Sequence, residues 1–456
     1  MLRAWLDRFL TALVRLVLRI FFREVEVVGL ELLPRGVPLV LVSNHVNGLI
    51  DPLLLLGPLP VLPRFLGKST LWKNPLIRPW AELAGAIPVY RKQDEGSGPS
   101  KNAETFARSH ELLAQGGSLA LFPEGKSHDE PELQPLKTGA ARIVLGAMER
   151  FGDLGIRIVP VGLIFDSKQT FRSRALVQVG EPIDPSVEWP LYEKDGPEAV
   201  RALTARVQDA LRDVTVNYPS WEEERLIARA ADLYGRPRLD LPRSRRLGES
   251  AELHRAFLEG YRDLRQRFPE RLEAVAGCVR EYDQLLRKHR LRDTHVAAVY
   301  PTGGVLRFVG RMLFRLLVYL PVAVVGTILN WPPYRIAGEI ARWAVRTADQ
   351  KATYKVFGSL FLFPLTWIAE SLLATRYLGG WPAGVLVFLI APLTGYAALF
   401  FHDSRVVFWR ESRAFLLLKT RKDLAAELRK RREEVFRGVE ELVDLWQSGR
   451  AMSQDA

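Results

Sequence analysis

The chain has 456 residues, of which 48% are hydrophobic. This length exceeds one ordinary domain, so we expect a globular catalytic unit with additional segments. The net charge of +12 at pH 7 favours an acidic partner. Because the basic residues lie beside apolar stretches, that partner is expected to be anionic lipid more than nucleic acid; a solvated excess of surface charge is the alternative. One cysteine, Cys278, excludes a disulfide framework or a cysteine metal site, which predicts that the soluble parts face a reducing compartment.

Residues 1–24 are predicted to form a basic amphipathic helix. On a helical wheel the polar residues share one side, namely Asp7, Arg8, Thr11, Arg15 and Arg19. Large apolar residues share the other side, namely Leu2, Leu6, Phe9, Leu13, Leu16, Val17 and Ile20. The interspersed charges differ from the uninterrupted apolar run of a secretory signal. Such a helix suits a lipid headgroup layer, and the alternative is a helix packed on its own domain.

Residues 25–190 alternate β-rich runs with helical patterns, which predicts an α/β domain of unknown strand order. The predicted strands are residues 37–42, 63–67, 87–90, 118–122, 156–165 and 175–179. The predicted helices are residues 74–84, 102–114 and 138–151. Glycines and a proline in 94–100 predict a flexible loop.

Residues 191–304 are charged and helical, with Pro219, Pro237 and Pro242 as interruptions. We interpret them as helices that cover or extend the catalytic domain. The arginine-rich stretch 236–246 is interpreted as an exposed loop, with phosphate contact as the alternative. The tail, residues 403–456, returns to a charged helical pattern without recognisable chemistry.

Residues 305–402 are predicted to be a membrane region. Segments 356–374 and 381–401 are each about long enough to cross a ~30 Å hydrocarbon layer, and Gly379 with Gly380 predicts a tight hairpin between them. The run 312–331 is shorter, contains Pro321 and has arginines on both sides. We therefore expect a re-entrant or interfacial segment there, or else a first span. In the re-entrant or interfacial case, both termini share the cytoplasmic face with the catalytic domain.

A polar cluster that contains Asn44, His45 and Asp51 follows the apolar run 37–42, and Asn44 is expected to help bind the substrate. Polar side chains at the carboxyl edge of strands commonly form the sites of α/β proteins. His45 can act as a general base near neutral pH, and Asp51 is near enough in sequence to hold the other imidazole nitrogen. In transfer to an alcohol the acceptor hydroxyl takes the place of a catalytic serine. By itself, such a pair is more often explained by capping and turn hydrogen bonds.

Groups that suit a phosphate follow other predicted strands. Arg91 comes directly after strand 87–90, and its guanidinium offers a fork of donors. Glu124, Gly125 and Lys126 come after strand 118–122, where the glycine permits close backbone approach and the carboxylate accepts hydrogen bonds from substrate hydroxyls or braces the loop. Lys137 lies beside the N-terminus of helix 138–151, a location that favours anions.

Strand 156–165 contains Pro160 and Gly162. We expect these two residues to shape a wall for the acyl chain or the acceptor. Each of these fragments alone could be an ordinary turn or cap.

Across residues 37–182 the order and spacing of these motifs resemble the glycerol-phosphate acyltransferase family. The motifs are NHVNGLID at 44–51, GAIPVYR at 85–91, FPEGKSHD at 122–129 and VPVG at 159–162. The resemblance implies an α/β acyltransferase domain with a mixed β-sheet flanked by helices, and His45 and Asp51 as the catalytic pair. It also implies that Arg91, Glu124 and Gly125 help to bind a phosphate-bearing acceptor. The implied donor is an acyl-CoA or acyl-carrier-protein thioester.

The sequence departs from the usual family pattern at two places. At both it resembles the family's branch of fungal-type glycerol-3-phosphate and dihydroxyacetone-phosphate acyltransferases. Five residues separate His45 from Asp51 where the family usually has four, and KSHD follows FPEG where it usually has TRS. The extra residue requires a bulge or loose turn if the two side chains are to meet. Lys126 or Lys137 would replace the missing arginine. We expect His128 to be a loop histidine whose ring makes hydrogen bonds within the protein, and the alternatives are a second acid or a donor to the phosphate.

The sequence therefore predicts a membrane-bound O-acyltransferase that acylates glycerol 3-phosphate or dihydroxyacetone phosphate in phospholipid synthesis. Acylation of 1-acylglycerol 3-phosphate is the nearest alternative, because both reactions use the same motifs. A thioesterase or lipid hydrolase would need a serine elbow, and no Gly-x-Ser-x-Gly occurs. A non-catalytic membrane scaffold is the third alternative.

We expect no metal and no cofactor other than the thioester co-substrate. The seven histidines lack ligand spacing and no glycine-rich nucleotide motif occurs. The expected partners are a phospholipid membrane, the acyl donor and the glycerol-phosphate acceptor, without nucleic acid. The predicted location is integral to the membrane, with the catalytic domain on the cytoplasmic face.

Overall fold

The computed structural model describes residues 2–75, 77–90, 99–168, 170–238, 246–297, 302–344 and 351–454. The chain divides into two compact units. The first contains Met1–Ser220, Arg246–Ala251 and Glu339–Gly358, and the second contains Trp221–Arg245, Glu252–Gly338 and Ser359–Ala456. The first unit therefore continues past the boundary predicted at residue 190.

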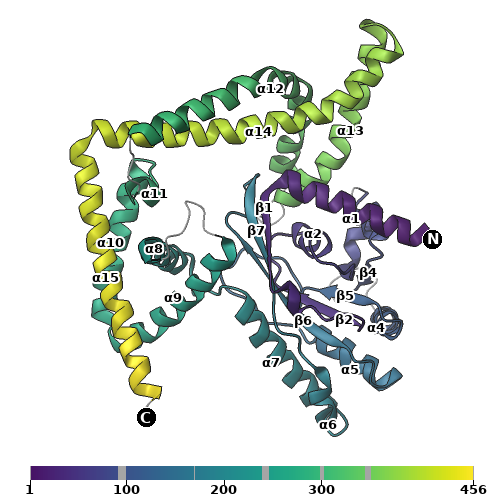
Figure 1. The fold of residues 1–456 in the computed structure, drawn as a ribbon. Coiled ribbons are helices and arrows are strands. Elements are labelled where there is room, and N and C mark those ends of the chain that lie inside the picture. The colour runs from purple at the N-terminus through teal and green to yellow at the C-terminus, as the bar shows by residue number, and fades with distance from the viewer. Residues whose placement is uncertain are drawn as a thin grey trace. The chain divides into compact units, whose positions relative to one another are not determined.

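A mixed sheet, seven-stranded within the described residues, forms the centre of the first unit (Figure 1). The strands are β1 Phe22–Val28, β2 Leu39–Ser43, β3 Arg64–Lys68, β4 Ile87–Val89, β5 Ser118–Leu121, β6 Arg157–Phe165 and β7 Ser173–Val179. Their order is β1-β7-β6-β2-β5-β3-β4, and neighbours are parallel except for the antiparallel pair β6 and β7. The predicted α/β class and mixed sheet are confirmed, and β1 is an additional strand.

The helices of the first unit are α1 Leu2–Phe21, α2 Ile50–Leu56, α3 Arg78–Leu83, α4 Pro99–Ala114, α5 Gly139–Phe151, α6 Trp189–Tyr192 and α7 Gly196–Val214, with 3-10 turns at Leu30–Leu32, Ser69–Lys73 and Pro185–Glu188. α5 and α7 share a buried apolar cluster with β2 and β6, for example Val144 and Leu203 with Val40 and Ile158. α7 therefore belongs to the core of the α/β unit, although its sequence was assigned to the charged extension. The predicted loop 94–100 lies outside the described residues up to 98, and α4 begins at Pro99.

Helix α1 has two apolar faces. Leu10, Val14 and Leu18 are buried at a spacing of four residues, and a Cβ on Gly57, at the end of α2, would lie 2.6 Å from Leu18 Cδ1. Another face carries three exposed apolar side chains, Trp5, Phe9 and Leu16. The predicted helix is confirmed, and it packs on its own domain along one face. The exposed face stays free for the predicted contact with lipid.

The second unit is helical. It contains α8 Trp221–Arg238, most of α9 Leu247–Arg267, α10 Pro269–Lys288, α11 Asp293–Ala297 and α15 Lys422–Gln454. Leu428 and Val435 of α15 are buried in one apolar cluster with Val279 and Tyr282 of α10. The first and last parts of this unit are therefore held together by a common core.

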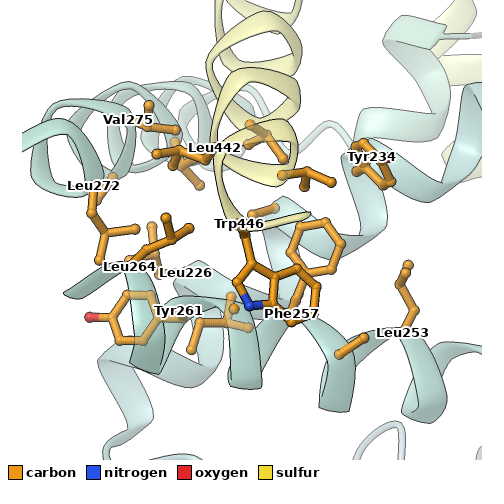
Figure 2. Close-up of a pocket in the computed structure, with 18 of the residues that line it drawn as sticks. Leu226, Tyr234, Leu253, Phe257, Tyr261, Leu264, Leu272, Val275, Leu442 and Trp446 are labelled. Atoms are coloured by element: carbon orange, nitrogen blue, oxygen red, sulfur yellow. The ribbon is translucent and has the colours of Figure 1, made fainter. Parts of the chain in front are cut away.

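An apolar pocket of about 190 Å³ lies among α8, α9, α10 and α15 (Figure 2). Phe257, Tyr261 and Trp446 are among its lining residues, together with several leucines and valines. The lining contains no charged side chain, so this pocket does not suit a phosphate. Neither His45 nor Asp51 is among its lining residues, so this pocket is not built by the predicted catalytic pair.

The remaining helices between α11 and α15 are long and apolar, namely α12 Thr302–Ala344, α13 Lys351–Tyr377 and α14 Trp381–Thr420. Segments Arg307–Trp343, Thr353–Tyr377 and Trp381–Thr420 are long and apolar enough to cross a membrane. The run 312–331 lies inside the continuous helix α12, so it forms no re-entrant turn, whereas an interfacial position or a first span stays a prediction. α14 continues to Thr420, beyond the span predicted for 381–401.

Asn330 of α12 joins these three helices through hydrogen bonds. Its Nδ2 donates to the Gly326 and Ala391 carbonyls at 2.9 and 3.0 Å, and its Oδ1 accepts from Trp367 Nε1 at 2.9 Å. A Cβ on Gly326 would lie 1.9 Å from the Thr394 carbonyl oxygen. Only a glycine at 326 lets α12 and α14 approach this closely.

Candidate active site

The predicted site residues from Asn44 to Asp51 and from Glu124 to Lys126 follow the carboxyl ends of β2 and β5, which are parallel neighbours. Because parallel strands end at the same edge of a sheet, their following loops meet there. The backbone N–H of His128, after β5, donates to the carbonyl of His45, after β2, at 3.1 Å. Two motifs that are far apart in sequence thus form one site.

The side chains of His45 and Asp51 meet, as predicted. Nδ1 of His45 lies 2.9 Å from Oδ2 of Asp51, and the same oxygen accepts the Asn47 N–H at 2.8 Å. Asp51 is fully buried in the first turn of α2. Gly48 adopts a φ of 54°, in the left-handed region that favours glycine. This loose turn accommodates the extra residue between His45 and Asp51.

Aromatic rings pack against one face of the His45 imidazole. Phe122 stacks on His45 with ring centroids 4.1 Å apart and planes 15° apart, and Phe65 stacks on Phe122 at 6.2 Å. The His45 side chain is 18% exposed. Nδ1 is engaged by Asp51, and no hydrogen bond joins Nε2 to a described residue. Nε2 is therefore the nitrogen that can take a proton from a substrate hydroxyl.

Glu124 is almost completely buried, at 3% exposure, and its carboxylate is engaged on both sides. Oε1 accepts the His45 N–H at 2.7 Å. Oε2 accepts the Gln134 N–H at 2.8 Å and lies 2.5 Å from His128 Nε2. Of the two roles predicted for Glu124, bracing the loop is the one visible here, and substrate binding stays a prediction.

Asn44 extends the pairing of β2 with β6 by one residue. Its Nδ2 donates to the Leu163 carbonyl at 3.0 Å, and its Oδ1 accepts the Leu163 N–H at 2.8 Å. The side chain is buried, so it imitates a backbone peptide inside the sheet. Its predicted contact with substrate stays a prediction.

Two lysines lie near the predicted phosphate site. Gly125 has a φ of 75°, and a Cβ there would lie 2.6 Å from Lys137 Nζ. The Lys137 ammonium therefore lies over the Gly125 backbone, shortly before α5 begins. Lys126 and Lys137 are both exposed. Arg91, the predicted guanidinium ligand, lies outside the described residues.

Pro160 and Gly162 pack against α7. A Cβ on Gly162 would lie 2.0 Å from the Val214 carbonyl oxygen, and a Cβ on Gly180 would meet side chains of both Pro160 and Val214. These residues let the last turn of α7 approach the sheet. Their predicted role in an acyl or acceptor wall stays a prediction.

Thr353 supports the turn from His45 to Asp51, the candidate catalytic turn, and no signal in the sequence indicates this role. It is buried in the first turn of α13, and its Oγ1 accepts the Leu49 N–H at 3.0 Å, between His45 and Asp51. Both residues belong to the first unit. The two positions are 304 residues apart in sequence, so only the fold brings them together.

Comparison with known proteins identifies two domains. Residues 24–164 match the Acyltransferase family, and residues 226–448 match the glycerol-3-phosphate acyltransferase 2 C-terminal domain. The first match contains His45, Asp51 and Glu124, and the second contains the helical pocket and the three apolar helices.

Glycerol-3-phosphate O-acyltransferase 2 from Saccharomyces cerevisiae is 30% identical over 288 residues, which cover 60% of this chain and 38% of that protein. Glycerol-3-phosphate O-acyltransferase 1 from the same yeast is 27% identical over 365 residues, which cover 74% of this chain and 47% of that protein. An uncharacterized acyltransferase from Schizosaccharomyces pombe is 24% identical over 540 residues, which cover 93% of this chain and 78% of that protein. The chain thus spans less than half the length of the two S. cerevisiae relatives. It carries an acyltransferase-family domain, followed by a domain that matches the C-terminal domain of glycerol-3-phosphate acyltransferase 2.

Proposed function

We propose that this chain transfers a fatty acyl group from a thioester to the free hydroxyl of glycerol 3-phosphate or dihydroxyacetone phosphate at a membrane. The observation that carries the proposal is the His45–Asp51 hydrogen bond of 2.9 Å inside an acyltransferase-family domain. The names of the yeast relatives, which are glycerol-3-phosphate O-acyltransferases, support this acceptor. The apolar helices support a membrane location.

The reaction follows from the position of the imidazole. Nε2 of His45 accepts the proton of the acceptor hydroxyl while the hydroxyl oxygen attacks the thioester carbonyl. The tetrahedral intermediate then collapses, the C–S bond breaks, and the imidazolium returns its proton to the departing thiolate. Asp51 keeps Nδ1–H directed towards itself and stabilises the imidazolium. General-base action of this kind is worth roughly 10²–10⁴ in rate.

Phosphate recognition is assigned to Lys126 and Lys137, with Arg91 as a third cation. Both lysines are exposed, and Lys137 lies over the Gly125 backbone near the N-terminus of α5. Ammonium groups and helix N-terminal N–H groups both favour a bound anion. This cationic corner would orient the acceptor, and His45 would then meet its hydroxyl.

The cytoplasmic face is the proposed location of the catalytic unit. Contacts within the units support an even number of membrane crossings after it. α15 shares a core with α10, so the segments before α12 and after α14 belong on one face. Thr353 bonds Leu49, so the start of α13 belongs on the face of the catalytic turn. No candidate span occurs among the described residues before α12, which favours one common face for all of these segments.

A single helix with both ends on one face does not cross the bilayer. In this proposal α12 therefore lies within one leaflet, and α13 and α14 cross as a hairpin whose turn, Gly379 and Gly380, reaches the opposite face. Basic residues flank both ends of the α12 apolar run, namely Arg307, Arg311, Arg315, Arg335 and Arg342. That arrangement agrees with the tendency of basic flanks to stay cytoplasmic.

The test is an assay of the full chain, reconstituted in phospholipid, with labelled acyl-CoA and one acceptor at a time. Glycerol 3-phosphate or dihydroxyacetone phosphate is expected to give a labelled monoacyl product, and His45→Ala is expected to abolish it. Activity with 1-acylglycerol 3-phosphate alone would assign the chain to second-position acylation. Thioester loss at one rate with and without acceptor would make it a hydrolase. Product formation that persists in His45→Ala would refute the proposed chemistry.

A further inference from the structure

The loop after β5 holds both backbone polar groups of His45. Glu124 Oε1 accepts the His45 N–H at 2.7 Å, and the His128 N–H donates to the His45 carbonyl at 3.1 Å. Both holding residues are buried, at 3% and 8% exposure. The imidazole of His45 thus extends from a backbone that is fixed on its two sides.

Hydrogen bonds also determine the tautomer of His128. Its Nδ1 accepts the Glu130 N–H at 3.1 Å, so in the neutral ring the proton is on Nε2. Nε2–H then donates to Glu124 Oε2 at 2.5 Å, and the Gln134 N–H donates to the same oxygen. The His128 ring therefore orients the carboxylate that orients His45.

We propose that His128 is a positioning residue for acyl transfer, which acts through Glu124 to hold the backbone of His45. The inference rests on the general-base role proposed for His45. A displacement of about 1 Å at a reacting group can lower the rate roughly 10²-fold. The position of the His45 imidazole is therefore expected to affect kcat. Neither Glu124 nor His128 needs to touch substrate for this role.

Two amide substitutions separate the two hydrogen bonds of the His128 ring. In His128→Gln the amide nitrogen falls near the former Nε2, so it can still donate to Glu124. In His128→Asn the shorter amide falls near the former Nδ1, so it can still accept from the Glu130 N–H but cannot reach Glu124. The pair is matched in chemistry and differs in which contact survives.

Steady-state kinetics of the reconstituted full chain are the measurement, with glycerol 3-phosphate and acyl-CoA as substrates. His128→Asn is expected to lower kcat roughly 10²-fold and to leave both KM values near those of the unmodified chain. His128→Gln is expected to restore most of that kcat. Equal activity of the two variants, whether high or low, would overturn the proposal. A loss expressed mainly as a raised KM for glycerol 3-phosphate would overturn it too, because it would indicate substrate contact.

Melting temperatures of the purified variants ensure that folded protein is compared. If His128→Asn does not fold, Glu124→Gln carries the test, since it keeps the acceptor for the His45 N–H and places an amide nitrogen against two donors. It is expected to lower kcat with unchanged KM, and unchanged kcat there would contradict the proposal. His45→Ala distinguishes a failure of the proposed function from a failure of the role of His128. Full activity of His45→Ala refutes the proposed function, whereas an inactive His45→Ala beside a fully active His128→Asn refutes only the role of His128.

Discussion

The two carboxylate oxygens of Asp51 differ in their hydrogen bonds. Its Oδ2 accepts from both His45 and the Asn47 N–H, whereas the buried Oδ1 has no hydrogen-bond partner among the described residues. The carboxylate lies in the first turn of α2, where free N–H groups favour negative charge. A buried acceptor of this kind keeps the proton of the neutral imidazole of His45 on Nδ1.

Asp51→Asn is predicted to lower kcat by roughly 10²–10⁴-fold. The asparagine amide can donate to Nδ1, which would place the imidazole proton on Nε2 and remove the base. The measurement is kcat for glycerol 3-phosphate acylation, together with the melting temperature. A variant that keeps its activity would mean that Asp51 has only a structural role in the turn.

Lys137→Gln is predicted to raise KM for glycerol 3-phosphate about tenfold, with a smaller effect on KM for acyl-CoA. A factor of ten corresponds to about 1.4 kcal/mol, within the range of one charge-assisted hydrogen bond to phosphate. Lys194 is another exposed lysine of the first unit, and Lys194→Gln is the charge-matched control. If the control shifts KM as strongly, the effect reflects net charge and not a phosphate contact.

Among the elements, α13 belongs to the membrane region and also contributes its first turns to the first unit. Thr353, Val356 and Phe357 are buried near its beginning, whereas Leu365, Leu372 and Tyr377 further along are more than half exposed. The buried turn belongs to the first unit and the exposed part to the second. One helix thus connects the turn that contains His45 with a surface suited to lipid.

Thr353→Val is predicted to lower both stability and kcat, because it leaves the Leu49 N–H without its acceptor. Leaving a fully buried N–H unpaired costs about 1–3 kcal/mol in the free energy of unfolding, and the half-buried Leu49 is expected to lie at the lower end of that range. Thr353→Ser, which keeps the hydroxyl, is expected to retain most of both. Thr366→Val is the matched control on the same helix, since among the described residues its hydroxyl bonds just the Leu362 carbonyl one turn earlier. Equal behaviour of the valine variants at 353 and 366 would exclude a specific role for Thr353 in the catalytic turn.

At the scale of the whole molecule, the intra-unit contacts and the candidate spans constrain each other. Three apolar helices would ordinarily suggest three crossings, which would leave α15 and α10 on opposite faces of the membrane. Their shared core makes that arrangement impossible without unfolding one of them. Two crossings satisfy both the core and the hydrogen bond from Leu49 to Thr353.

Site-directed labelling tests this topology in sealed vesicles of known orientation. In a Cys278→Ser background, single cysteines replace Trp343 at the end of α12, Gly379 in the hairpin turn, and the exposed Ser448 of α15. An impermeant maleimide is expected to label positions 343 and 448 from the cytoplasmic face and position 379 from the opposite face. Labelling of 343 and 448 from the opposite face would indicate three crossings.

Local signals in the sequence were sufficient for much of the site. The contact between His45 and Asp51 could be predicted because the residues are six apart and a turn brings them together, and Gly48 supplies the conformation that the extra residue needs. The strands after which the motifs occur could be predicted because buried parallel strands are short apolar runs. The same reasoning assigned α7 to an extension, because it lies in the charged helical region predicted for residues 191–304, and only packing showed its buried face.

Side-chain partners distant in sequence could not be predicted in this way. Two roles were predicted for Glu124, bonds to substrate hydroxyls or bracing of its loop, and only the fold shows the N–H donors from three different residues that surround it. Asn44 was expected in the site, and the fold pairs its amide with β6. No periodicity or spacing in the sequence encodes such pairings, since they depend on which loops the sheet order makes neighbours.

The amino-acid sequence by itself predicted the acyltransferase domain, the contact between His45 and Asp51 and the apolar segments, because each depends on nearby residues or on local hydropathy. The tertiary structure alone decided how the histidine is held, by Phe122, Glu124 and His128, and that Thr353 supports its turn. It also joined α10 to α15, which limits the crossings between them. The physical reason is that buried hydrogen bonds and apolar contacts form between whichever groups the fold makes adjacent, whatever their separation along the chain.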